Sequence, residues 1–187
     1  MSYIQSNGTQ WIDSEFIANS QNLIIEMKFE YTGLINDVSL YGSEISGEKY
    51  DGVPYSQSNN VSFYVGTTRN ILDYPMSLNT EYILKSAIEN NKITIDINGT
   101  LKSSNFSGDI ETGRTMAIFA NNCSDSVWQE ASIRLYYFKI ISNGVLVKDF
   151  IPVLDLEDIP CLYDKVNRRN HYNNGSGAFI IDTLNNI

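Results

Sequence analysis

Apolar and polar residues alternate with a period of two along much of the chain. The clearest example is the segment 21–31, QNLIIEMKFEY, in which a charged residue occupies every second position after Ile25. The apolar side chains that alternate with polar ones are those of Leu23, Ile25, Met27, Phe29 and Tyr31. This period is typical of a β-strand with one buried face, and a helix would not repeat its charges in that way.

The segment 131–153, ASIRLYYFKIISNGVLVKDFIPV, contains two runs of β-branched and aromatic residues that meet at Asn143-Gly144. A two-residue Asn-Gly loop predicts a β-hairpin, because both residues tolerate a positive φ. Apolar side chains then lie on both faces of the ribbon, which is typical of a strand pair inside a two-layer structure. The expected cross-strand pairs are Ile141 with Leu146, Ile140 with Val147, and Phe138 with Asp149.

Further strands are predicted from the same signals. The Asn7-Gly8 turn predicts a small hairpin over residues 3–13, with Ile4 opposite Trp11. A three-stranded meander is predicted over residues 81–106. The remaining predicted strands are 37–42, 61–67, 115–120 and 178–182, with a short CLYD segment at 161–164.

Three stretches are predicted to be irregular: 42–60, 70–79 and 121–130. The first is the longest and is rich in Gly, Ser, Asn and Tyr, so it ranks first as a recognition surface. In total, about twelve strands and no convincing helix predict an all-β fold. We expect two antiparallel sheets packed face to face, a sandwich or jelly roll, in a single domain over residues 1–187.

The composition is that of a globular protein that does not bind polyanions. Apolar residues make up 42% of the chain, aromatic residues 12% and charged residues 19%, with twelve tyrosines. The net charge of −9 opposes binding to nucleic acid or to anionic lipid. The only basic cluster is Lys165, Arg168 and Arg169, which we interpret as a solvated loop rather than an anion site.

Neither membrane insertion nor a disulfide framework is expected. No window approaches eighteen uninterrupted apolar residues, and the N-terminus has no basic region followed by an apolar run, so no membrane span and no signal peptide are predicted. A fragment of an exported protein, or a component of an assembly that needs no leader, is compatible with this. Cys123 and Cys161 lack metal-type spacing, and we expect two free, half-buried thiols rather than a bridge.

Three stretches resemble the concanavalin A-like, or laminin-G-like, jelly-roll domains. They are YIQSNGTQWID, EYILKSAIENNKITIDINGT, and IRLYYFKIISNGVLVKDFIPVLD followed by PCLYDKVNRRNHYNNGSGAF. The most specific part covers residues 133–179. The closest resemblance is to the branch found in tail and other structural proteins of bacteriophages and prophages and in bacterial surface proteins. One departure is VNRRNHYNN after the LYD element, which is more basic than the corresponding family stretch, so no ligand residue is transferred to it.

The resemblance implies a lectin-like module that binds a glycan or a cell-surface receptor. The alternative is a structural adaptor that contacts other subunits of a phage particle, and either role belongs at a virion or cell surface. Fold alone does not decide between these classes. Exposed tyrosines around a groove favour sugar binding, whereas one broad apolar patch favours protein contact.

Two predicted loops carry the residue types that bind sugars, namely aromatic rings that stack on pyranose faces and polar side chains that hydrogen-bond hydroxyl groups. The candidate ligand-binding residues are Tyr50, Asp51 and Tyr55 in the first loop, and Asn121, Asn122, Asp125 and Trp128 in the second. We predict that these two loops converge on one rim and form the recognition site. The alternative for Trp128 is that it caps the core where the chain re-enters the sheet.

Calcium is the usual metal of many laminin-G-like domains, so the resemblance allows a calcium site. Asp125, Asp51 and Asp37 lie in or beside predicted loops and are candidate ligands. No EF-type spacing or paired-carboxylate run supports such a site, and Asp155 to Asp158 are expected to form a solvated turn. No other cofactor is expected.

No catalytic signature is present, so a non-catalytic function is expected. A glycosidase needs two carboxylates that flank the scissile bond. The nearest candidate is Asp96, which would need a second carboxylate brought opposite it by a distant strand. His171 lies in an Asn-rich stretch without a nucleophile motif and is interpreted as a surface residue.

Overall fold

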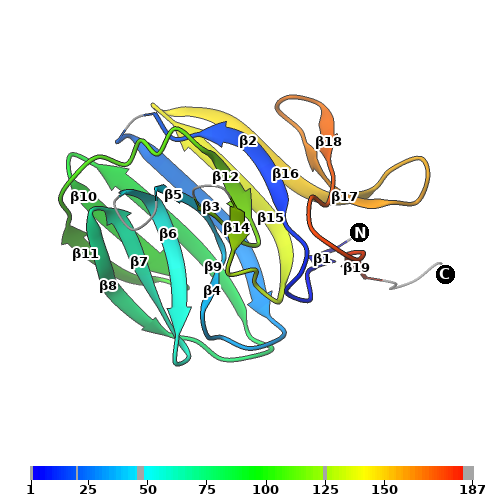
Figure 1. Cartoon of the computed structure of the whole chain (residues 1–187), viewed down its shortest axis with the longest axis horizontal. Helices are drawn as coiled ribbons and strands as arrows, with labels where there is room; N and C mark the ends of the chain where they lie inside the picture. Colours follow the sequence, from blue (N-terminus) through cyan, green and yellow to red (C-terminus); the bar gives the residue numbers. More distant parts are fainter. Residues whose placement is uncertain (1, 20, 46–48, 124–125, 183–187) are drawn as a thin grey trace.

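The computed structural model describes residues 2–19, 21–45, 49–123 and 126–182. Within these ranges no residue is helical, and nineteen strands form two sheets that pack face to face (Figure 1). The predicted all-β sandwich is therefore confirmed. The described part of the chain contains no helix that is long and apolar enough to cross a membrane.

The larger sheet has ten strands, eight of which form a continuous series. In order across the sheet they are β11 (Thr100–Asn105), β10 (Lys92–Ile97), β9 (Glu81–Glu89), β3 (Leu23–Tyr31), β15 (Ile133–Ser142), β16 (Val145–Leu154), β17 (Pro160–Asp164) and β18 (Arg169–His171). In addition, β1 (Ile4–Gln5) pairs with both β15 and β19 (Ile180–Ile181). The strands nearest the two ends of the chain thus lie side by side (Figure 1).

The smaller sheet has nine strands, six of which form a series. In order they are β14 (Ser126–Trp128), β13 (Asn121–Cys123), β5 (Tyr41–Ile45), β6 (Lys49–Gln57), β7 (Asn60–Gly66) and β8 (Thr68–Pro75). Off this series, β12 (Thr115–Ile118) pairs with β2 (Ile12–Ile17) and with β5, and β4 (Val38–Ser39) pairs with β6. The strand pairs are antiparallel except for β13 beside β5.

The core lies between the two sheets and is built from alternate residues of each strand. In β3 the buried apolar side chains are those predicted from the period of two, Leu23, Ile25, Met27, Phe29 and Tyr31. Buried tyrosines also join the sheets directly. The hydrogen bonds are Tyr31 Oη to Ser56 Oγ at 2.6 Å, Tyr41 Oη to Ser86 Oγ at 2.8 Å, and Tyr74 Oη to Ile95 O at 2.8 Å. These partners satisfy hydroxyl groups whose burial would otherwise be costly.

The predicted long hairpin is formed by β15 and β16, and the pairing of Ile141 with Leu146 is confirmed. The other two predicted pairs are wrong by one residue. The observed partners are Lys148 for Ile140, Asp149 for Lys139, and Phe150 for Phe138. The register shifts between Ile140 and Ile141, because a β-bulge adds Val147 to β16 and changes every later pairing.

The predicted hairpin over residues 3–13 is wrong, because β1 belongs to the larger sheet and β2 to the smaller one. The chain crosses between the sheets at the Asn7-Gly8 turn. Side chains replace a strand ladder there: Asn7 N donates to Gln10 Oε1 at 2.9 Å, and Gly8 N donates to Ser6 Oγ at 3.1 Å. A turn signal therefore located the bend correctly but not the partners of its strands.

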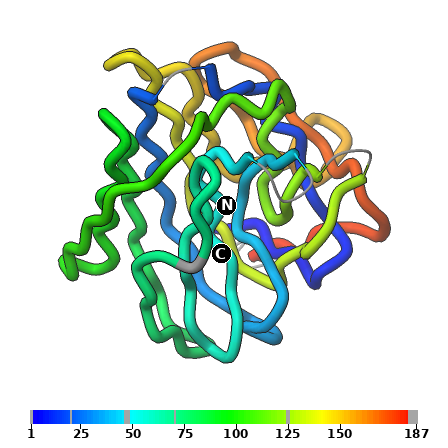
Figure 2. Tube along the Cα trace, turned by 60° about the vertical axis from the view of Figure 1, so that its left-hand side comes forward, coloured from blue at the N-terminus to red at the C-terminus, as the bar shows by residue number. Residues whose placement is uncertain are grey.

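The crossing segment is held by the C-terminal part of the chain. Asn174 N donates to Trp11 O at 2.8 Å, and Ser176 N donates to Thr9 O at 2.9 Å. In Figure 2 this part of the chain, coloured red, runs beside the blue N-terminal segment. Two stretches that are far apart in the sequence thus form one structural unit.

Each of the three stretches predicted to be irregular contains strands. Residues 42–60 contain most of β5 and all of β6, residues 70–79 contain most of β8, and residues 121–130 contain β13 and β14. The strands form in spite of their Gly, Ser and Asn content because neighbouring strands cover them, and tertiary context outweighs β-propensity. Gly52, with a φ of 101°, lies at a bulge in the β6 ladder, which explains the irregular appearance of the sequence.

Two predictions on single residues have different outcomes. The interpretation of His171 as a surface residue is wrong. His171 lies in β18 and is 5% exposed, and its ring packs edge-on against the Phe150 ring with the ring centres 5.0 Å apart. Cys123 and Cys161 are free, as predicted, and both are fully buried rather than half-buried. Burial raises the pKa of the Cys161 thiol to about 11, so it is an unreactive core residue.

Candidate functional site

A hollow on the smaller sheet contains three of the predicted ligand-binding residues. It has a volume of about 410 Å³. The residues that line it are Glu44 of β5, Tyr50 and Tyr55 of β6, Tyr64 of β7, Arg69 of β8, Trp128 of β14, and Gln129. We call it the Trp128 hollow. Segments that are about 80 residues apart in sequence are thus adjacent, although they are strands rather than the predicted loops.

Three aromatic rings form a continuous row in the Trp128 hollow. The Tyr64 ring lies 5.1 Å from the Tyr50 ring, at an interplanar angle of 74°, and 5.1 Å from the Tyr55 ring, at 37°. The Arg69 guanidinium lies 5.3 Å from the centre of the Tyr50 ring. Tyr50 is only 2% exposed, so its ring packs against Tyr64 without offering surface to a ligand. Trp128, in contrast, is 52% exposed. The exposed Trp128 does not cap the core, which was its alternative interpretation.

The phenol groups of this row remain protonated well above neutral pH. Burial raises the pKa of Tyr50 to about 12, and the nearby Glu44 carboxylate contributes to the rise. Burial also raises the pKa of Tyr64 and of Tyr55, and the Tyr55 hydroxyl donates a hydrogen bond of 2.5 Å to Asp37. The hollow therefore offers uncharged aromatic surface beside one guanidinium and one carboxylate.

Asp51 does not line the hollow, although it follows Tyr50 directly. It is 1% exposed, and its carboxylate accepts hydrogen bonds from Ser43 N at 2.9 Å and from Ser43 Oγ at 2.8 Å. Burial raises the pKa of Asp51 to about 7, even though both Ser43 bonds favour the ionised form. Asp51 is an interior residue, so its predicted contact with a ligand does not fit the structure.

The predicted asparagines also have structural partners. Asn121 is 1% exposed, and its Nδ2 donates to Glu44 Oε2 at 2.6 Å. It therefore positions a carboxylate of the hollow without lining the hollow itself. Asn122 Nδ2 donates to Thr115 O at 2.8 Å. Asp125 lies outside the described residues.

Sequence reasoning missed four residues of the hollow, namely Glu44, Tyr64, Arg69 and Gln129. Tyr64 had a usable signal, since it lies between Phe63 and Val65 in a strand whose period of two places it on the opposite face. Arg69 lies between the predicted strand 61–67 and the predicted irregular stretch 70–79, and its place beside Tyr50 depends on the pairing of β8 with β7. Such long-range pairing is not visible in a local pattern.

The described residues do not fit a calcium site. They include no group of three or more His, Cys, Asp or Glu side chains that could hold a metal ion. The two candidate ligands that the structure describes do not converge: Asp51 is buried and bonded to Ser43, whereas Asp37 is exposed and bonded to Tyr55. A bound calcium ion requires several convergent oxygen atoms, so we derive no role for it.

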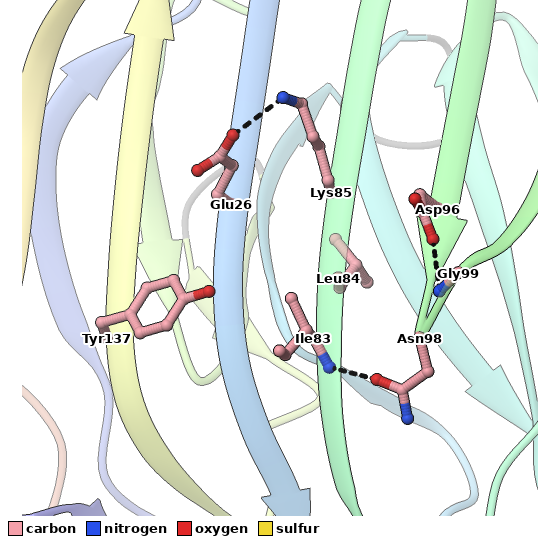
Figure 3. A pocket seen from close by; sticks show the side chains of 8 residues that line it. All are labelled: Glu26, Ile83, Leu84, Lys85, Asp96, Asn98, Gly99 and Tyr137. Atoms are coloured by element: carbon pink, nitrogen blue, oxygen red, sulfur yellow. Dashed lines mark hydrogen bonds and ion pairs between the residues drawn. The ribbon is translucent and has the colours of Figure 1, made fainter.

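A second hollow, of about 350 Å³, lies on the larger sheet (Figure 3). We call it the Ile83 hollow; Glu26 of β3, Lys85 of β9 and Asp96 of β10 are among its lining residues. Glu26 and Asp96 each pair directly with Lys85 across the strands, which places their Cα atoms roughly 10 Å apart. Glu26 Oε1 lies 2.9 Å from Lys85 Nζ. Asp96 thus has a carboxylate neighbour, with a lysine between the two.

Comparison with known proteins gives a match in structure but not in sequence. No protein-family model matches the chain, and no curated protein does. A Bacteroides ovatus protein described as carbohydrate-binding superimposes with a TM-score of 0.66 and 12% identity, over 92% of this chain and 57% of that one. A heptameric SAP-like pentraxin from Limulus polyphemus gives a TM-score of 0.56 and 11% identity, over 74% of this chain and 76% of that one.

The LG4-5 domains of the mouse laminin alpha1 chain give a TM-score of 0.56 at 12% identity, over 78% of this chain and 42% of that one. The chain therefore spans about half the length of two of these structures. Together they show that the fold is the concanavalin A-like, laminin-G-like jelly roll, as the sequence resemblance implies. The resemblance to the phage branch stays a prediction.

Proposed function

We propose that this chain is a non-catalytic module that binds a glycan in the Trp128 hollow. The observation that carries the proposal is the row of three tyrosine rings beside the exposed Trp128. The exposed Trp128 and the partly exposed Tyr55 and Tyr64 rings can stack on the apolar face of a pyranose. Arg69 and Gln129 can hydrogen-bond its hydroxyl groups. A Bacteroides ovatus protein of the same fold is described as carbohydrate-binding, which supports this ligand class.

We further propose that the glycan belongs to a cell surface, and that the chain is part of a phage or prophage structural protein or of a bacterial surface protein. The support for this context is the sequence resemblance over residues 133–179. The net charge of −9 favours neutral saccharides over strongly anionic polymers.

An assembly module is the second candidate. The observation in its favour is the set of exposed apolar side chains on the larger sheet, which includes Ile83, Leu101 and Leu146. Charged residues interrupt this set, because Lys85 pairs with Glu26 and Lys28 pairs with Glu81 at 2.8 Å. A mixed surface of this kind is less suited to a permanent subunit contact than one broad apolar patch.

Glycoside hydrolysis has less support than binding. Glu26 and Asp96 share the Ile83 hollow, but Lys85 lies between them in the cross-strand register and forms an ion pair with Glu26. A hydrolase needs two carboxyl groups that are free to act on opposite sides of one bond. Incubation of array-positive glycans with the protein should therefore give no shortened products by mass spectrometry.

The test is binding of the purified protein to an array of bacterial and host glycans, first with calcium and then with a chelator. We expect selective binding that survives the chelator, since the described residues offer no calcium site. Binding that disappears with the chelator would show that a metal takes part. Absence of binding by folded protein in both conditions would refute the glycan proposal and favour the assembly role.

A further inference from the structure

The Ile83 hollow lies on the opposite side of the sandwich from the Trp128 hollow. Its strands, β3, β9, β10 and β15, belong to the larger sheet, and their inward residues form the core. Its lining side chains, apart from that of the core residue Leu84, are therefore on the outer face. The two hollows share no residue, so a ligand in one leaves the other accessible.

One wall of the Ile83 hollow is apolar. Ile83 is 53% exposed, and Figure 3 shows the Tyr137 side chain reaching over β3 with its hydroxyl group directed toward Ile83. Burial raises the pKa of Tyr137, with a contribution from Glu26, so the hydroxyl remains a donor. An isoleucine and a phenol ring on either side of a shallow depression form a surface on which an apolar ligand face can rest.

The opposite wall is polar and has unused hydrogen-bonding capacity. Asp96 accepts one bond, from Gly99 N at 2.8 Å through Oδ1, and no ion pair of Asp96 is found within the described ranges. Lys85 uses one donor on Glu26 and retains others. Asn98, in contrast, is committed to the turn, since its Oδ1 accepts from Ile83 N and its Nδ2 donates to Glu81 O.

This combination selects the chemical class of the ligand. Two carboxylates and one lysine give the hollow a net negative charge, which disfavours phosphate, sulfate and uronate groups. An apolar wall opposite convergent donors and acceptors matches a ring that has one apolar face and an edge of hydroxyl groups. A volume of about 350 Å³ is at the lower end of ligand pockets and suits one or two sugar units.

We propose that the Ile83 hollow is a second site for a neutral pyranose, held between Tyr137, Ile83 and Asp96. The chain then binds saccharide on both outer faces and can connect two glycan strands. The proposal shares its ligand class with the proposed function but rests on different residues, so each can fail without the other.

The experiment is a two-dimensional ¹H–¹⁵N NMR titration of the full chain. The probes are glucose, galactose, mannose and N-acetylglucosamine, together with a linear trisaccharide of each. We expect at least one probe to shift the amide signals of Ile83, Lys85 and Gly99. In the Tyr137→Ala and Asp96→Asn variants, the Kd obtained from these shifts should rise at least tenfold. Any response of the Trp128 amide should be retained.

The matched control is Tyr136→Ala, which removes the neighbouring ring on the same strand. Tyr136 does not line the hollow, and its hydroxyl donates to Glu30 at 3.1 Å. Its response should equal that of the unmodified chain. The spectrum of each variant without ligand shows whether the variant is folded. If Tyr137→Ala is destabilised, Asp96→Asn still tests the site, because the Asn side chain keeps an acceptor for Gly99 N.

The outcomes separate the two sites. No shifts at Ile83, Lys85 and Gly99 with any probe would overturn this proposal, whether or not the Trp128 hollow responds. Shifts that persist unchanged in both variants would overturn it as well. Shifts here without any response at Trp128 would support this site and count against the proposed function.

Discussion

At the scale of single residues, the most informative side chain is that of Asp51. A carboxyl group with 1% exposure normally needs a cation, yet its partners are two neutral Ser43 donors. Its pKa rises to about 7 as a result. In an unfolded chain the pKa of Asp is about 3.9. The folded state therefore binds the proton more tightly, and this contribution to stability is complete below about pH 4 and lost as the pH rises through about 7.

Asp51→Asn should remove this pH dependence. As the pH rises from 4 to 8, the original chain should lose stability relative to the variant, and the difference between their free energies of unfolding should change by at most about 4 kcal/mol. Urea unfolding at several pH values measures it. His171 and Asp164, whose pKa values are lowered in the folded protein, contribute to the pH dependence of both chains. Their contributions cancel when the free energy of unfolding of the variant is subtracted from that of the original chain. A constant difference across this range would show that Asp51 is ionised in the folded state throughout.

The two thiols provide a second prediction at this scale. Cys123 and Cys161 have no exposed surface, and burial raises the pKa of Cys161 to about 11. A thiol-reactive dye at pH 8 should label neither residue in the native protein and both in 6 M guanidinium chloride. Rapid labelling of native protein would contradict the burial of both residues.

At the scale of elements, the block formed by β16, β17 and β18 depends on one buried carboxylate. Asp164 has no exposed surface, and it accepts hydrogen bonds from Asp149 N, Val166 N and Asn167 Nδ2 at 3.2, 3.0 and 2.6 Å. Its Oδ2 lies 3.3 Å from the buried Lys148 Nζ. Burial alone would raise its pKa, but these donors and the lysine hold the pKa below its usual range. The LYD turn is thus fixed by a single side chain.

Asp164→Ala should lower the free energy of unfolding by roughly 3–5 kcal/mol, because it leaves Lys148 buried without a partner. Glu157→Ala, in the exposed turn between β16 and β17, is the control and should change it by less than about 0.5 kcal/mol. Denaturant midpoints measure both effects. Equal midpoints for the two variants would contradict a structural role for Asp164.

Local sequence patterns predicted elements where one face is buried and the turn is short. The strand with Leu23, Ile25 and Met27 and the turn at Asn143-Gly144 are examples, and φ angles of 51° and 75° confirm the expected turn conformation. The patterns failed where a strand forms only because a neighbour covers it, as in β6 and β8. The same limit applies to the Trp128 hollow: Trp128 and Tyr55 had a local signal, whereas Arg69 depends on sheet pairing.

At the scale of the whole molecule, the two ends of the chain are joined through the contact between residues 9–11 and 174–177. Gly175 is essential there, since a Cβ atom at this position would lie 2.1 Å from Thr9 O. Gly175→Ala should therefore destabilise the protein by about 1–3 kcal/mol or more through displacement of the backbone. Gly144→Ala is the comparison, because nothing lies within 4 Å of its Cβ atom and only its φ of 75° is unfavourable.

Thermal unfolding followed by circular dichroism compares the two glycine variants. The larger loss in melting temperature should belong to Gly175→Ala. A smaller loss than that of Gly144→Ala would show that the contact between the two ends contributes little to stability.

The central claim is that glycan recognition takes place in the Trp128 hollow, and calorimetric titration with an array-positive glycan tests it most directly. Trp128→Ala should raise Kd at least tenfold, about 1.4 kcal/mol, and the double variant Trp128→Ala, Tyr55→Ala should raise it further. Tyr172→Ala, which removes an exposed ring that does not line the hollow, should leave Kd unchanged. Unchanged affinity in a folded double variant would contradict the account.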